Sequence, residues 1–210
     1  MKTVENLRSL PQRARKLARR FAGETSAVAA IEFAFIAPIL IAMYMGTIEI
    51  ANAIDTNKRV GRVSALIADL ITQKQNIDKD EIEAITKIGS KTLYPYFASA
   101  PSFEIVHFEV TDEASPKAKV VWSVGTGDFD AMPYSQDDLL TDVPAELMVR
   151  DSFLVRVTTD LEYRVLVTWV TDVKTDTTTG KNYGFIEMGE TYYYRPRLNN
   201  KEIKCDDCPT

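Results

Sequence analysis

The chain has 210 residues, enough for one ordinary domain and a membrane anchor but short for two large domains. Its net charge at pH 7 is −5, and the charge is unevenly distributed. Residues 1–27 carry seven basic and two acidic side chains, a net charge of +5, so the remaining residues carry −10. This acidic remainder argues against nucleic-acid binding, and membrane topology explains the basic tip better than nucleic acid does.

An apolar run of 21 residues, 28–48, follows the basic tip, and Glu32 is its only charged residue. At about 1.5 Å per residue, a helix of this length spans about 30 Å, the thickness of a hydrocarbon core. The run exceeds the roughly 7–15 apolar residues of a secretory signal peptide. We therefore predict a retained transmembrane helix, with a cleaved signal peptide and a buried core helix as alternatives. The preceding basic cluster predicts a cytoplasmic N-terminus.

Two residues inside this run are unusual for a membrane helix. Pro38 removes one backbone hydrogen bond and is expected to bend the helix. Glu32 is costly in lipid, which makes it a candidate functional residue. The alternative is that its carboxylate lies close enough to the end of the span to reach the lipid headgroups.

Residues 49–72 are expected to continue the helix as an amphipathic stem, because apolar side chains recur at helical spacings. A second helix is predicted after this stem, with Asn76 or Asp78 as its N-cap. Acidic residues in its first turns suit the positive end of the helix dipole. Pro95 is expected to end it, since proline disfavours helix in the residue before it.

From about residue 102 the apolar pattern changes to period two, which predicts strands. Residues 125–147 are predicted to form a long exposed loop, either a partner contact or a variable surface loop. We predict an α+β fold, with a four- to five-stranded antiparallel sheet packed against the stem. The predicted strands are Phe103–Val110, Lys119–Val124, Ser152–Thr159, Tyr163–Val170 and Phe185–Arg195.

The sequence has no nucleophile-elbow, P-loop, dinucleotide or zinc motif, so we expect no enzyme activity, no cofactor and no metal. The single histidine, His107, is expected to be a polar face residue or a satisfied core group. Cys205 and Cys208 form a terminal Cys-x-x-Cys, where a local disulfide is favoured over a free dithiol or a zinc half-site. Tyr192–Tyr194 precedes arginines and is either a partner-binding edge or an ordinary last strand.

The string Ala27–Phe35, followed by Pro38 and by Gly46-Thr47-Ile48-Glu49, resembles the N-terminus of TadE-like proteins. These are minor pilin-like components of the Flp/Tad pilus apparatus in bacteria. The family pattern is a basic leader, a small residue, a short apolar stretch, a glutamate, an aromatic residue, and then an apolar helix with an early proline. Ser64–Ile71 and the C-terminal tail, Tyr194–Arg197 with the Cys-x-x-Cys, are also similar to this family.

The resemblance implies roles for residues at the start of the apolar run. In pilin relatives, prepilin peptidase cuts just before this run, usually after glycine, and the glutamate becomes the fifth mature residue. The equivalent junction here is Ala27–Val28, which places Glu32 fifth and the aromatic Phe33 next. Alanine at the junction departs from the pattern, so both a cleaved and an uncleaved chain remain open. In type IV pilins the equivalent acid is thought to pair with a neighbour's N-terminal amine during assembly.

The resemblance implies a minor pilin or assembly component of a Tad/Flp pilus, anchored in the bacterial inner membrane and serving adhesion. It would act through helix–helix docking in the bilayer and through head contacts. Its partners would be other pilin-like subunits, the inner-membrane assembly machinery, membrane lipid and, for a cleaved chain, prepilin peptidase. The alternatives are a membrane-tethered periplasmic ligand-binding or sensor module, which would use the loop at 125–147, and a periplasmic hydrolase.

The predicted organisation has four parts. They are a basic cytoplasmic leader (1–27), the transmembrane helix (28–48), a periplasmic stem with the second helix (49–97), and a β-rich periplasmic head with the Cys-x-x-Cys tail (98–210).

Overall fold

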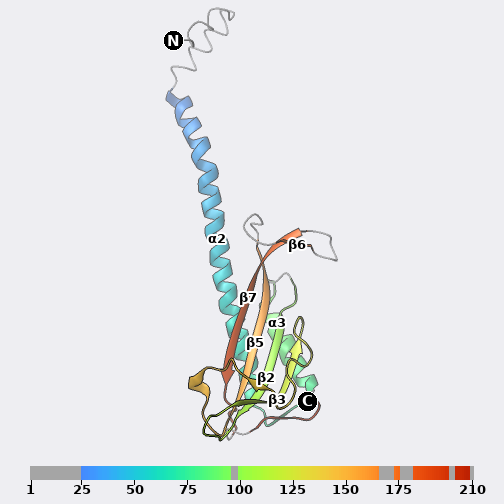
Figure 1. The fold of residues 1–210 in the computed structure, drawn as a ribbon. Helices are drawn as coiled ribbons and strands as arrows, with labels where there is room; N and C mark the ends of the chain where they lie inside the picture. The colour runs from blue at the N-terminus through green and yellow to red at the C-terminus, as the bar shows by residue number, and fades with distance from the viewer. Residues whose placement is uncertain (1–24, 96–98, 166–172, 176–181, 199–201, 209–210) are drawn as a thin grey trace, which may run out of the picture. The chain divides into compact units, whose positions relative to one another are not determined.

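The computed structural model of the chain describes residues 25–95, 99–165, 173–175, 182–198 and 202–208 (Figure 1). The chain forms two compact units, Met1–Ile48 and Glu49–Thr210. Helix α2 (Thr25–Thr72) is continuous across the boundary between them. Most of the predicted cytoplasmic leader lies outside the described residues.

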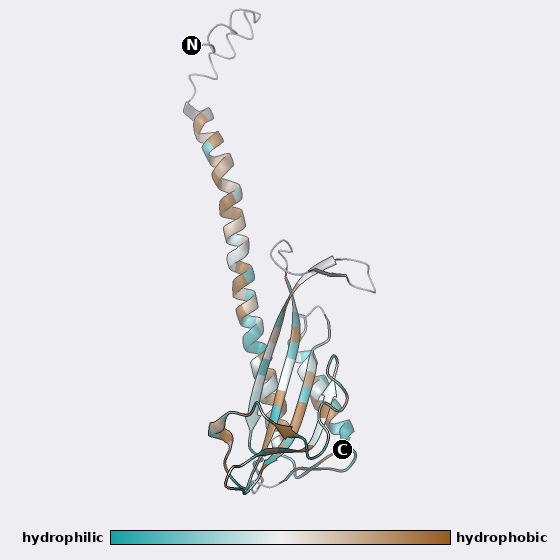
Figure 2. Cartoon of the chain, in the orientation of Figure 1, coloured by the Kyte–Doolittle hydropathy of each residue, from teal (hydrophilic) through white to brown (hydrophobic). Residues whose placement is uncertain are grey.

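The N-terminal part of α2 is apolar on all sides, and its large side chains are exposed (Figure 2). Among the described residues, α2 is the one helix long and apolar enough to cross a membrane, and none of its most apolar window is buried. A surface of this kind is unfavourable in water and favourable in a hydrocarbon core. Pro38 lies inside the helix.

The C-terminal part of α2 is an amphipathic stem, as predicted. Its buried apolar residues recur at spacings of one, three and four, which places them on one face of the helix. They are Val60, Val63, Ile67, Ala68 and Ile71.

Helix α3 (Lys79–Leu93) packs in the same core as the stem. Its N-cap is Asp78, whose carboxylate accepts a hydrogen bond of 2.7 Å from the Glu81 amide. The cap prediction is confirmed for Asp78, whereas Asn76 lies just before it in strand β1 (Asn76–Ile77). The helix ends ahead of Pro95, as expected.

The head contains an antiparallel sheet with the strand order β4-β3-β2-β5-β7-β6. Four strands are long and two are short edge strands, and the predicted α+β fold is confirmed. The strands are β2 (Ser102–Val110), β3 (Ala118–Thr126), β4 (Leu139–Leu140), β5 (Ser152–Val165), β6 (Val173–Thr175) and β7 (Asn182–Tyr194). A separate parallel bridge joins β1 to β8 (Lys204–Cys205).

One strand prediction is wrong in its boundaries. The two predicted strands at 152–159 and 163–170 are a single strand up to Val165, and the remaining residues of the second lie outside the described part. The intervening residues keep the alternation, since Leu161 is buried and Asp160 is exposed. They contain no glycine or proline to interrupt the ladder. The predicted loop at 125–147 also contains β4 and the short 3-10 helix Ala145–Leu147.

The sheet has an apolar core on each face. The first core packs the stem and α3 against alternate residues of the strands, including Phe103, Val155 and Leu161. The second core lies on the opposite face, where the segment at 134–148 packs over Val106 and Phe108. The two faces of the sheet therefore have different coverings, and this difference determines which side chains stay accessible.

Candidate functional site in the membrane helix and the head

The predicted assembly and processing residues lie in the first turns of α2. Ala27 and Val28 are the third and fourth residues of the helix. Val28 and Glu32 are four positions apart and lie on one face, followed by Phe33, of which 68% is exposed. Among the described residues, Glu32 is exposed and has no hydrogen bond or ion pair. An ionised carboxylate at this depth needs a cation or a hydrogen-bond donor from outside this helix.

The stem is attached to the sheet by polar contacts in addition to its apolar face. The buried hydroxyl of Ser64 donates a hydrogen bond of 2.8 Å to Oγ1 of Thr159 on β5. The side-chain amide of Asn57 donates to the carboxylate of Glu190 on β7 at 2.9 Å. The stem is therefore bonded to both β5 and β7.

Glu49, the residue that follows the predicted membrane span, contacts the sheet through Tyr163 on β5. Burial, together with the charge of the Glu49 carboxylate and its hydrogen bond with the phenol, raises the pKa of Tyr163 to about 12. Tyr163 is 4% exposed, so this contact lies in the first core. Sequence reasoning placed Glu49 in the family string but gave no signal for its partner.

The long segment between β3 and β5 is held to the sheet by Arg156. Its guanidinium bonds to Glu104 on β2 at 2.9 Å and to Asp142 in the segment at 2.7 Å. It also lies 5.2 Å from the centre of the Tyr134 ring. Burial raises the pKa of Glu104, although the nearby Arg156 opposes this shift. Nothing in the sequence pattern singled out Arg156, because it occupies a strand position where an exposed cation is common.

The C-terminal tail is fastened to the sheet through the only histidine. Nε2 of His107 accepts a hydrogen bond of 3.1 Å from the Ile203 amide, and Nδ1 lies 3.0 Å from the Leu154 carbonyl. Nδ1 therefore carries the proton, and both ring nitrogens have backbone partners. Burial lowers the pKa of His107 to about 4. His107 is a satisfied core group, one of its two predicted roles.

The two cysteines close a small loop at the end of this tail. Cys205 and Cys208 form a disulfide, with Cα atoms 5.5 Å apart. Inside the loop, the carboxylate of Asp207 accepts a hydrogen bond of 2.7 Å from the Lys79 amide at the start of α3. The loop thus satisfies a donor at the helix N-terminus, where a negative charge is favourable.

The three tyrosines of β7 alternate as in an ordinary strand. Tyr192 is on the stem side of the sheet, with its hydroxyl 3.0 Å from the place a Cβ at Gly61 would take. Tyr193 is on the other side and meets Phe108 edge-on at 6.4 Å. Tyr194 packs against the first core.

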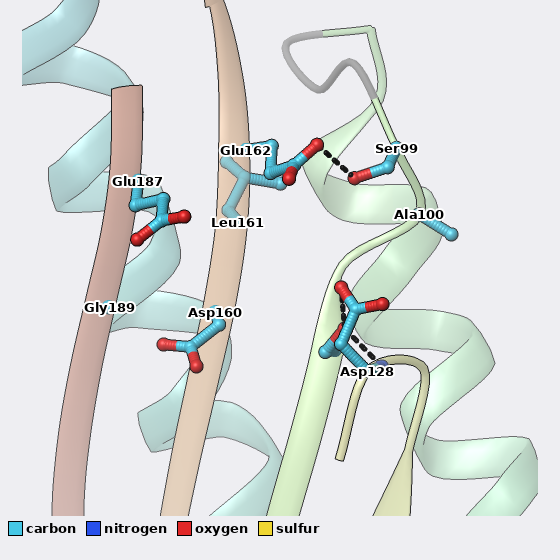
Figure 3. A pocket seen from close by; sticks show the side chains of 9 residues that line it. Ser99, Ala100, Asp128, Asp160, Leu161, Glu162, Glu187 and Gly189 are labelled. Atoms are coloured by element: carbon cyan, nitrogen blue, oxygen red, sulfur yellow. Dashed lines mark hydrogen bonds between the residues drawn. The ribbon is translucent and has the colours of Figure 1, made fainter. Parts of the chain in front are cut away.

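A shallow cleft of about 350 Å³ opens on the side of the sheet that faces away from the stem. Its lining includes four carboxylates, from Asp128, Asp160, Glu162 and Glu187 (Figure 3). Burial raises the pKa of Asp160, and the charges of Glu187 and Asp128 add to this shift. Among the described residues, no group of histidine, cysteine or acidic side chains has the arrangement to hold a metal ion.

The fold is α+β, and its one long helix, whose apolar part could span a membrane, continues into the stem of a sheet-containing head. Residues 27–68 match the family model described as TadE-like protein, so the resemblance inferred from the sequence is confirmed for this segment. A search of the curated proteins and a search of the solved structures each gave no match.

Proposed function

We propose that the chain is a minor pilin or assembly component of a Tad/Flp pilus, anchored in the bacterial inner membrane with its head in the periplasm. The observation that carries the proposal is Glu32. It is an exposed carboxylate with no partner among the described residues, in an apolar helix within the TadE-like segment. Its partner is proposed to be a cation of a neighbouring pilin-like subunit, for which the N-terminal amine of a cleaved chain is one source.

The continuous helix supports a mechanism for this role. Docking of residues 28–48 against a neighbour in the bilayer would hold the chain beside that neighbour, and the stem is bonded to the sheet through Ser64 and Asn57. The head would then lie within reach of other subunits. We propose that the chain does this without catalysis. In support, both nitrogens of its only histidine are engaged by backbone groups and are not free to act as a base.

The test is replacement of Glu32 by glutamine in the native host, with pilus formation as the readout. Glutamine keeps the shape but removes the charge, so pili should be lost while the amount of membrane-inserted protein stays unchanged. The matched control is Thr47→Val, a near-isosteric change in the same helix that removes a hydroxyl and no charge. Among the described residues, this hydroxyl donates to the Met43 carbonyl of its own helix and has no other partner. Normal pili in the Glu32→Gln strain would contradict the proposal and favour the tethered sensor, for which the helix is only an anchor.

Cleavage at Ala27–Val28 is tested separately by the intact mass of the protein recovered from host membranes. A chain that begins at Val28 would show processing. A chain that retains its leader would identify an unprocessed assembly component, for which another subunit must supply the cation that meets Glu32.

A further inference from the structure

A groove of about 350 Å³ runs between the stem and strand β7. Two stem cations one helical turn apart, Lys58 and Arg62, line it together with the Glu190 carboxylate. The other lining residues are Asn57, Gly61, Ala65 and Tyr192. Gly61 keeps the groove open, since it has no side chain beside the tyrosine ring.

Within the part of the chain that the structure describes, Lys58 and Arg62 have no hydrogen bond or ion pair, although the charge of each lowers the pKa of Asp55. Two acids of this region already have closer partners. Asp55 pairs with Arg59 at 2.8 Å, and Glu190 accepts the hydrogen bond from Asn57. Lys58 and Arg62 are both exposed, so they are available to carboxylates from another molecule.

The acidic cleft of Figure 3 provides such carboxylates on the opposite face of the same sheet. The strand register establishes this placement. Tyr192 and Met188 pair with Val157 and Leu161, which face the stem. Glu187 and Gly189 pair with Glu162 and Asp160, which alternate with those residues and so face away from it.

The cleft places like charges next to each other, which costs stability in an isolated head. Glu162 and Glu187 are directly opposed across two strands, an arrangement that is unfavourable for like charges. The Asp160 carboxylate lies over Gly189, where a Cβ would be only 2.5 Å from it, so the glycine leaves room for this acid in the cleft. Among the described residues neither Asp160 nor Glu187 has an ion pair. A cationic partner would relieve this repulsion.

We propose that the basic groove of one copy binds the acidic cleft of a second copy of this chain. Because the two surfaces lie on opposite faces of the sheet, each contact leaves one groove and one cleft free. The association is therefore heterologous, the kind that extends into an open array rather than closing at a dimer. The inference specifies a head contact of the proposed pilus component and rests on that function.

The experiment uses full-length protein in host membranes, with two copies that carry different tags and are co-purified after mild solubilisation. Reversing the charge of the groove with Lys58→Glu/Arg62→Glu should reduce co-purification of the two tagged copies about tenfold, since an acidic groove would then face the acidic cleft. Reversing the charge of the cleft with Asp160→Lys/Glu187→Lys should reduce co-purification to a similar extent. A groove-reversed copy mixed with a cleft-reversed copy should recover association, which also shows that neither variant is misfolded.

The charge-matched control is Lys91→Glu/Lys204→Glu, at two exposed lysines outside the groove, and it should associate like the wild type. In wild-type membranes, a zero-length carbodiimide crosslinker should join Lys58 to Asp160 or Glu187, and mixed isotope labelling should show that the joined peptides come from different copies. If a reversed variant is degraded, Lys58→Gln/Arg62→Gln provides a milder change that should still weaken co-purification.

Three outcomes would overturn the inference: undiminished co-purification of both reversed variants, an equal loss in the charge-matched control, or no recovery in the mixture. The outcome for pili separates the two proposals. If Glu32→Gln abolishes pili while groove reversal leaves co-purification intact, the self-contact is wrong and the proposed function stands. If the two reversed variants and their mixture behave as expected but Glu32→Gln leaves pili normal, the contact between copies stands and the proposed function is wrong.

Discussion

Nε2 of His107 accepts the backbone hydrogen bond of Ile203 at 3.1 Å, so one neutral imidazole in the middle of β2 fastens the C-terminal tail. The neighbouring Trp122 donates its indole N–H to the Ile203 carbonyl at 2.8 Å. Both polar groups of one buried backbone residue are thereby satisfied by side chains of the sheet. The imidazole can accept this bond only while it is unprotonated.

Acid should weaken the head through His107. Its pKa is about 4 in the folded chain and about 6.5 when unfolded. Between these values the unfolded chain binds the proton and the folded chain does not, so stability is fully present above pH 6.5 and is lost as the pH falls to 4. The loss from this residue should be about 3 kcal/mol, measured by urea unfolding of the detergent-solubilised chain.

The control for this prediction is His107→Gln, which offers a donor and an acceptor but does not titrate in this range. Other groups contribute to acid sensitivity, so the readout is the difference between wild type and variant. Equal losses of stability in the two proteins between pH 6.5 and 4 would contradict the assignment.

Removing the Arg156 guanidinium should destabilise the head and release the segment before β5. In Arg156→Met, Glu104 stays largely buried without its partner, and breaking such a pair costs about 3 kcal/mol. We expect a lower urea midpoint and faster proteolysis within residues 125–147. Arg150→Met is the matched control, since Arg150 is exposed and, within the described segments, bonds only to the Ala114 carbonyl. This control should change the free energy of unfolding by less than about 0.5 kcal/mol. An equally small effect of Arg156→Met would show that the contacts of Arg156 do not stabilise the head.

Gly89 should not tolerate a larger side chain, because α3 and the stem approach each other closely there. A Cβ at this position would lie 2.9 Å from Ile67 and 3.0 Å from Val63, both in the first core. Gly89→Val should therefore cost about 1–3 kcal/mol through overpacking. Gly61→Ala is the comparison: its nearest neighbour is the end of the partly exposed Tyr192 side chain, which can move. A Gly89→Val protein as stable as the Gly61→Ala protein would mean that the two helices are free to separate.

Loss of the disulfide should affect the start of α3 more than the rest of the head. Cys205→Ser/Cys208→Ser opens a short loop, for which the chain-entropy relation gives about 2 kcal/mol. Asp207 would no longer be held against the Lys79 amide, so hydrogen exchange there should accelerate. Asp206→Asn, at an exposed residue in the same loop, should leave that exchange rate unchanged. Unaltered exchange in the serine variant would show that the tail holds Asp207 without the bridge.

Much of the fold follows from local pattern. The apolar run, the stem, the Asp78 cap and the long strands each depend on periodicity or on one capping residue, which neighbouring positions in the chain reveal. The strands β4 and β6 could not be predicted, because a few residues are too short to show a period. The division of β5 into two strands was wrong, because the polar pair around Leu161 resembled a turn although its alternation continued.

The sequence by itself determined that this chain has an apolar helix long enough to span a membrane, with Glu32 as the one charged residue of 28–48, and a helical stem ahead of a β-rich head. Only the tertiary structure decided that Glu49 meets Tyr163, that Arg156 joins Glu104 to Asp142, and that the basic groove and the acidic cleft lie on opposite faces. The reason is physical. Periodicity is a property of neighbours along the chain, whereas these contacts depend on strand register, and a shift of one residue would move every side chain to the other face.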